Sequence, residues 1–292
     1  MTSQMPSGEG ASVDPSIPKR RLSLARLRRI PLPVRIGAFI VGVLILCAIF
    51  VPLFSADPYQ LNFANILSPP SFAHLFGTDE NGRDLFARIF LGLRLDLLVV
   101  AFVTYISLPI GLVLGAAGAY FGGKYDTVVA RLTDIAISFP FIVLVIAIIA
   151  ITGPGLKGIM IGVPVVSWAL YARLARSEML VLRELPFMEA AEVLGFTKRR
   201  IIFRHGIPNL IRNCLVYSTI DAMGNFLLLA GLSYLGIGVQ PPAAELGAII
   251  AEGQPYLLQA WWISTIPGLV IVLFGLGIGL IGEGLSDSGL VT

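Results

Sequence analysis

Six long apolar stretches, separated by polar segments, constrain what this chain can fold into more than any other feature of it. A bilayer core of about 30 Å needs about 20 apolar residues in a helix, and lipid offers no hydrogen bonds to a backbone that is not helical. The fourth stretch is near the minimum length and must extend into its flanks. We therefore expect an all-α membrane protein with six transmembrane helices, at residues 36–54, 97–121, 135–152, 159–172, 207–239 and 261–282.

The composition agrees with this class. Charged residues make up 13% of the chain and hydrophobic residues 56%, whereas about a quarter of the residues are charged in ordinary soluble domains. So few charges could not cover the surface of a soluble protein of this length. The basic clusters lie beside apolar spans, which favours membrane orientation over nucleic-acid binding, and we expect no nucleic-acid partner.

Lysine and arginine are distributed unevenly between the spans. With the N-terminus inside, the inner segments hold 7, 2 and 8 of them (17 together) and the outer segments hold 4. Positive charge accumulates on the cytoplasmic side of membrane proteins, so we predict both termini in the cytoplasm. The predicted organisation is a disordered, basic cytoplasmic tail (1–30), an N-terminal transmembrane helix with an extracytoplasmic loop (31–94) and a transmembrane domain (95–287).

Catalytic and cofactor signals are absent from the sequence. Residues 118–125 nearly match a phosphate-binding loop, but Tyr125 stands where Ser or Thr would hold magnesium. Residues 79–84 resemble part of a calcium loop with its glycine misplaced. His74 and His205 lie on opposite predicted sides of the membrane, and the two cysteines form no pairing or metal pattern. We expect no catalytic, metal or cofactor site in this chain.

The segment 183–208 predicts a pair of short cytoplasmic helices. Pro186 suits a first helical position, and Gly195 suits the left-handed residue that follows a helix. Thr197 can cap a second helix that ends at Gly206 and Pro208. A plain surface hairpin between two spans is the structural alternative. On the other side of the membrane, residues 246–256 are expected to include a short helix within the outer loop 240–259.

Several motifs in this order resemble one known family. Glu189-Ala190-Ala191-x-x-x-Gly195, followed by Ile207-Pro208, looks like the coupling loop of bacterial ABC-importer permeases. Others resemble the C-type permease subunit of dipeptide and oligopeptide ABC importers, within the binding-protein-dependent transport permease superfamily. These are Gly77-Thr78-Asp79-x-x-Gly82-Arg83-Asp84, Tyr171-Ala172-Arg173, Phe203-Arg204-His205-x-Ile207-Pro208-Asn209 and Leu235-Gly236-x-Gly238-Val239-Gln240-Pro241-Pro242.

This resemblance implies a type I importer permease core with one extra N-terminal helix, in the bacterial cytoplasmic membrane. It implies a paralogous B-type permease, ABC ATPase subunits that bind the ATP and magnesium, and an extracytoplasmic substrate-binding protein. It assigns ATPase coupling to Glu189, Ala190, Ala191, Gly195, Ile207 and Pro208. A permease for nickel, glutathione or another small solute is the alternative within transport, and a membrane scaffold or embedded enzyme is the alternative outside it.

A polar stripe crosses the fifth apolar stretch. An aspartate near the middle of a bilayer costs about 3 kcal/mol by insertion scales, so Asp221 is expected to avoid lipid. Ser218 and Asn225, three residues before and four after it, lie on the same helix face. These three residues are candidates for the lining of the solute pathway. A structural hydrogen bond from Asp221 to a neighbouring helix or to the partner permease is the alternative.

Overall fold

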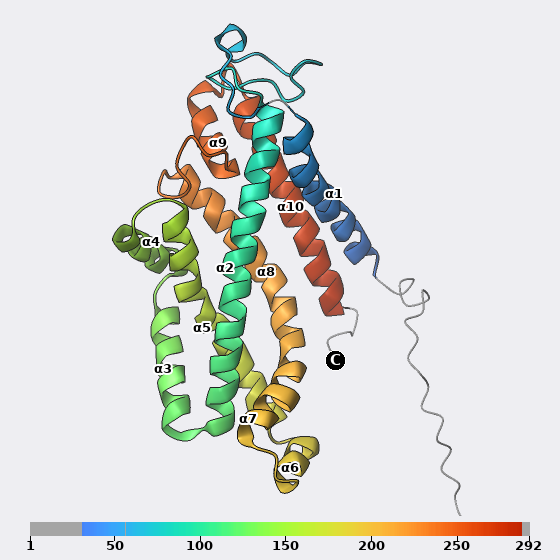
Figure 1. The fold of residues 1–292 in the computed structure, drawn as a ribbon, viewed down its shortest axis with the longest axis vertical. Helices are drawn as coiled ribbons and strands as arrows, with labels where there is room; N and C mark the ends of the chain where they lie inside the picture. The colour runs from blue at the N-terminus through green and yellow to red at the C-terminus, as the bar shows by residue number, and fades with distance from the viewer. Residues whose placement is uncertain (1–30, 56, 288–292) are drawn as a thin grey trace, which may run out of the picture. The chain divides into compact units, whose positions relative to one another are not determined.

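The structure is a computed structural model that describes residues 31–55 and 57–287 (Figure 1). The tail predicted at residues 1–30 lies outside the described residues. Regular elements in the described part are all helices, which confirms the all-α class. The helices are α1 (Leu32–Phe54), α2 (Leu85–Phe121), α3 (Gly123–Ser138), α4 (Phe141–Thr152), α5 (Leu156–Leu182), α6 (Pro186–Val193), α7 (Lys198–Ile201), α8 (Ile207–Tyr234), α9 (Leu246–Gly253) and α10 (Trp262–Asp287), with short turns η2 (Phe63–Asn65), η3 (Ile202–Gly206) and η4 (Gln254–Tyr256).

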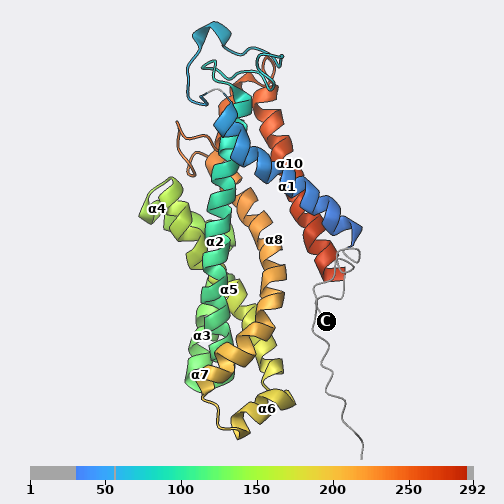
Figure 2. The same cartoon turned by 45° about the vertical axis from the view of Figure 1, so that its right-hand side comes forward.

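Five of the described helices are long and apolar enough to cross a membrane. The number of candidate spans rises to six if the bent pair α3–α4 is counted as one span. Helix α2 is central among them and packs against α5, α8 and α1. Helix α5 approaches α2 closely at Gly111 and Gly115, which have no side chain. A Cβ at either position would overlap the backbone of Trp168 or Ala172. Glycines at this spacing let two membrane helices approach each other backbone to backbone. Helix α1 crosses α10 and α2 on the opposite side (Figure 2).

The second span begins earlier than predicted, at Leu85 rather than at Leu97. Its first turn is capped by Asp84, whose Oδ1 accepts a hydrogen bond from the backbone N–H of Ala87 at 3.0 Å. The added turns carry charged residues, and Arg88 among them is fully buried between acidic side chains. Since one of those partners, Glu252, lies 164 residues later, the sequence pattern alone gave no reason to place Arg88 in a helix.

The third predicted span, 135–152, is broken. Helices α3 and α4 meet at a bend of 93°. Phe139 has extended backbone angles (φ −90°, ψ 144°), and Pro140 occupies the N-cap of α4. Proline disfavours helical geometry at the preceding residue and has no N–H to continue the hydrogen-bond ladder. The stretch predicted as one straight span is therefore two helices joined at a near right angle.

Helix α9 and the turn η4 confirm the short helix predicted within residues 246–256. A buried pair of carboxyl groups fixes α9 to α2. Glu245 caps α9, with its Oε2 accepting the N–H of Ala248 at 2.7 Å. Asp96 on α2 accepts the N–H of Leu246 at 3.3 Å. Neither side chain is more than 1% exposed, and desolvation by burial raises the pKa of Glu245 to about 7.

This pKa predicts a pH-dependent stability. A carboxyl whose pKa rises from 4.5 to about 7 on folding stabilises the fold fully below pH 4.5 and loses that contribution as pH rises through 7. The loss between pH 5 and pH 8 should be on the order of 2 kcal/mol. Glu245→Gln keeps an acceptor for the cap and should flatten the dependence of the thermal unfolding midpoint on pH. Glu184→Gln, at an exposed position, is the control; equal pH profiles for wild type and Glu245→Gln would contradict the assignment.

Candidate functional site

The predicted cytoplasmic hairpin lies at one end of the helices, away from the loop 57–84 (Figure 1). Pro186 is the first residue of α6, and Glu189 lies in its first turn, where the helix dipole favours a carboxylate. Gly195 has φ +76°, and its N–H donates to the carbonyl of Glu192 at 2.9 Å. The N–H of Phe196 donates to the carbonyl of Ala191 at 3.1 Å. This left-handed glycine turn confirms the predicted end of α6.

The second helix of the hairpin departs from the prediction. Thr197 caps α7 as expected, with its Oγ1 accepting the N–H of Arg200 at 3.3 Å. The chain does not stop at Gly206 and Pro208, however. It continues through the π-turn η3 into α8, and Pro208 falls within the first two residues of α8. Proline is tolerated in the first turn of a helix, and the π-turn η3 directly precedes α8, so the helical path runs on where the sequence indicated an end.

The residues assigned to ATPase coupling differ in their exposure. Glu189, Ala190, Gly195 and Pro208 are exposed, Ile207 is half-buried, and Ala191 is 4% exposed. Large apolar side chains that sequence reasoning did not single out are exposed beside them. Val193 is 88% exposed and Leu194 71% exposed. Their position just before the glycine turn, on the side opposite Met188, is the signal that could have identified them.

Two contacts connect the hairpin to the spans. The Tyr120 hydroxyl on α2 donates to Glu192 Oε1 on α6 at 2.6 Å. Arg183, at the end of α5, donates to the carbonyl of Ala119 at 2.8 Å. Met188 is buried in the same apolar cluster. A displacement of α6 would therefore pull on the end of α2.

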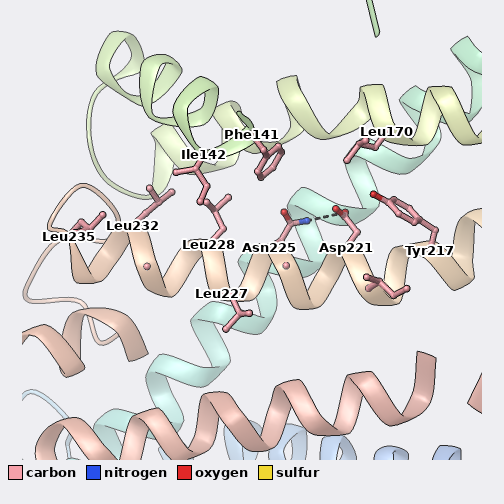
Figure 3. Close-up of a pocket in the computed structure, with 13 residues that line it drawn as sticks. Phe141, Ile142, Leu170, Tyr217, Asp221, Asn225, Leu227, Leu228, Leu232 and Leu235 are labelled. Atoms are coloured by element: carbon pink, nitrogen blue, oxygen red, sulfur yellow. Dashed lines mark hydrogen bonds between the residues drawn. The ribbon is translucent and has the colours of Figure 1, made fainter. Parts of the chain in front are cut away.

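A cavity of about 490 Å³ lies between α8, the first turn of α4 and the middle of α5 (Figure 3). Most of its lining is apolar, including Phe141, Leu170 and Leu228. Asp221 and Asn225 supply polar groups on the α8 wall, and Figure 3 places them side by side. An apolar cavity with a few convergent polar groups is the common form of a small-molecule site.

Asp221 is held by neutral donors. Its Oδ2 accepts hydrogen bonds from the Tyr171 hydroxyl at 2.9 Å and from Asn225 Nδ2 at 3.0 Å. Asn225 also donates to Thr104 Oγ1 on α2 at 3.0 Å. No arginine or lysine of the described residues forms an ion pair with Asp221. Tyr171 and Thr104 were missed as partners because they lie on other helices.

Ser218, the third member of the predicted stripe, is placed differently. It is 1% exposed and its hydroxyl donates to the carbonyl of Leu215 at 2.7 Å. It does not contribute to the lining of the cavity. The structure therefore brings Asp221 and Asn225 together in the cavity wall and leaves Ser218 inside the helix packing.

A buried ionic cluster lies at the N-terminal end of α2, far from the hairpin, where the loop 57–84 meets α9. The carboxylate oxygens of Asp79, Glu80 and Glu252 lie within 4.8 Å of one another. Arg88 Nη2 donates to Glu252 Oε2 at 2.9 Å, and Arg83 Nε donates to Asp79 Oδ2 at 2.6 Å. Burial raises the pKa of Glu80. Since guanidinium groups already bind these oxygens, the cluster is an ion-pair network that ties α9 to α2 and to the loop.

Comparison with known proteins gives a consistent set of relatives. Residues 107–287 match the family of binding-protein-dependent transport system inner membrane components. The dipeptide transport system permease protein DppC of Alkalihalophilus pseudofirmus is 39% identical over 254 residues, covering 87% of this chain and 84% of that protein. The di/tripeptide permease DppC of Pseudomonas aeruginosa is 35% identical over 259 residues, covering 86% of each.

Two further similarities are informative. The glutathione transport system permease protein GsiD of Escherichia coli is 34% identical over 266 residues, covering 90% of this chain and 87% of that protein. A solved chain from the inward-facing MetNI methionine ABC transporter has a TM-score of 0.54 at 21% identity, covering 70% of this chain and 96% of that one. The latter supports the fold alone.

Proposed function

The chain belongs to the family of inner membrane components of binding-protein-dependent transport systems, and from this membership we propose that it forms half of the translocation pathway of an importer of di- or oligopeptides. It is a multi-pass permease of the ABC-importer class, as the resemblance implied. Permeases of this class work with ATPase and substrate-binding partners. The class of the carried solute is supported by one observation, the similarity to dipeptide and di/tripeptide permeases over most of both chains.

Uptake by the assembled transporter tests the substrate class. The chain, its companion permease, the ATPases and the binding protein would be reconstituted in proteoliposomes and given ATP with a labelled dipeptide. We expect ATP-dependent dipeptide uptake that unlabelled peptides compete away. The similarity to the glutathione permease makes glutathione the second candidate. Uptake of glutathione or nickel, with none of dipeptide or longer peptides, would overturn the proposal.

The exposed hairpin supports the role of α6 as the contact for an ATPase subunit. Glu189, Ala190 and Gly195 form an accessible surface, and Val193 and Leu194 add apolar area next to it. Exposed apolar patches with a polar rim are typical of protein interfaces. Ala191 and Ile207 would support the surface from within, and Pro208 would border it. ATP and magnesium would be bound in the ATPase partners, and this chain would hold neither.

The cavity on α8 supports a pathway that is completed by a second, paralogous B-type permease. It is open on one side, and Asp221 presents there a carboxylate without an ion-pair partner in the described residues. Such a group would attract the protonated amino group of a peptide. Asn225 would orient Asp221, and Ser218 would contribute through helix packing.

Asp221→Asn is the specific test of that carboxylate. Asparagine keeps an oxygen acceptor for Tyr171 and Asn225 and removes only the charge. We expect import of peptides with a free amino terminus to fall several-fold, because one charge-assisted contact is worth about 1.5 kcal/mol or more, while N-acetylated peptides lose little. Ser218→Ala is the control. If both peptide classes are imported normally by Asp221→Asn and only Asp221→Leu fails to assemble, the residue is structural.

Both termini are proposed to lie in the cytoplasm, as the uneven lysine and arginine distribution indicates. A cysteine introduced at the exposed Ala73 in a variant without Cys47 and Cys214 should react with an impermeant maleimide added outside the cell. Ala244, in the loop 240–259, is 2% exposed and is unsuitable for such labelling. Labelling of Ala73→Cys only after the cytoplasmic side is opened would reverse the orientation.

A further inference from the structure

A second apolar groove, separate from the cavity on α8, runs between α1 and α2 and is floored by α8 and α10. Its volume is about 500 Å³. Exposed aliphatic side chains form its walls, and Phe274 closes its base. The wall residues include Ile45 and Ile49 of α1 and Leu98 and Ala101 of α2.

Arg94 gives the groove one charged end. It is exposed, lines the groove, and has no hydrogen-bond or ion-pair partner among the described residues. The other two arginines of this part of the chain, Arg83 and Arg88, are both paired with acids. Asp96 cannot form an ion pair with Arg94, because side chains two residues apart on a helix point in directions about 200° apart. Asp96 faces α9 instead. The arginine next to the apolar groove therefore lacks an anion.

The position of Arg94 along α2 matches the level of lipid headgroups. It lies three residues before the charge-free stretch that begins at Leu97, and long basic side chains at such a boundary extend toward the interface. From Arg94 to Tyr105, the last α2 residue of the groove, the helix rises about 16 Å. One leaflet of a bilayer core is about 15 Å thick, so the groove has the length of one acyl chain.

We propose that this groove binds one phospholipid, with an acyl chain along α1 and α2 and the phosphate on the Arg94 guanidinium. Arginine presents a planar fork of donors that suits two phosphate oxygens. The acyl chain would cover aliphatic side chains that no other part of the described structure covers. The bound lipid would hold the crossing helix α1 against α2 and supply the missing anion. The inference is independent of the solute that the transporter carries.

The test uses the assembled transporter purified from nanodiscs that contain phosphatidylglycerol and phosphatidylethanolamine. Native mass spectrometry counts the phospholipids retained after mild detergent extraction. We expect the wild type to retain one phospholipid per copy of this chain, and Arg94→Gln to retain it about tenfold less, since the variant loses the charge-assisted contact to the phosphate. Arg94→Lys should restore part of the retention, and Ala101→Trp should abolish it by filling the groove while Arg94 stays in place.

The controls separate a bound lipid from other occupants. Arg131→Gln removes one charge from an exposed position on α3 and should leave retention unchanged. Equal retention by wild type and Arg94→Gln overturns the proposal, because the retained lipid is then bulk annular lipid. A photoreactive residue at Ala101 should form an adduct of phospholipid mass. An adduct with another protein subunit at that position would show that a partner helix occupies the groove and would overturn the proposal as well.

Discussion

Replacing Gly195 with arginine is expected to reduce ATP-driven import strongly while the chain still inserts and assembles. Gly195 is in the left-handed region with φ +76°, where a residue with a Cβ costs about 1–2 kcal/mol. An added Cβ would meet no heavy atom within 4 Å, so the chain around it need not be displaced. The arginine side chain would instead project from the exposed surface next to α6, where we propose that an ATPase subunit binds. Import should fall at least about tenfold, equivalent to 1.4 kcal/mol or more.

Gly236 is a matched control for this prediction. It also has φ +76°, follows the end of α8, and has open space around its Cβ position. Gly236→Arg should therefore cost the same backbone strain without altering the α6 surface. Both variants would be compared for retention of the ATPase on purification, ATP hydrolysis stimulated by the binding protein, and peptide uptake. If Gly195→Arg imports peptide as Gly236→Arg does, α6 is not the coupling contact.

Replacing Arg88 with methionine is expected to destabilise the protein by about 3–5 kcal/mol, the usual cost of leaving a buried charge without its partner. Arg88 is 0% exposed, with Glu252 at 2.9 Å and Asp79 at 3.3 Å. The five side chains of the cluster, three acids and two arginines, carry a formal charge of −1, which becomes −2 without Arg88. For a chain of this size we expect the thermal unfolding midpoint to fall by about 10 °C.

Two further variants complete this experiment. Arg173 forms an ion pair with Asp134 at 3.2 Å, but both side chains are more than half exposed, so Arg173→Met should cost less than about 1 kcal/mol. Adding Glu252→Met to Arg88→Met returns the formal charge to −1 and should recover part of the lost stability. Equal unfolding midpoints for Arg88→Met and Arg173→Met would contradict the contribution to the free energy of unfolding that we assign to the buried cluster.

Local sequence signals predicted the hairpin of residues 183–208 well up to its second half. The structure confirms the positive φ predicted for Gly195, the first helical position predicted for Pro186 and the cap predicted for Thr197. Each of these features depends on neighbours within four residues. The continuation through η3 into α8 was not predicted. A proline after a glycine is compatible with either a helix end or a helix start, and only the packing of the buried Ile202 and Gly206 selects between them.

The sequence by itself determined the class of the protein, the number of apolar spans and the family resemblance. The class and the spans depend on runs of residues that are long and apolar enough to exclude water, and the resemblance depends on short motifs. Both are properties of the chain and not of its partners. Only the tertiary structure decided where charged residues are tolerated. Arg88 is held by Glu252, 164 residues later, and Asp221 by Tyr171, 50 residues earlier. A buried charge is stable only beside its counter-charge or donors, and such neighbours exist only once distant helices have packed.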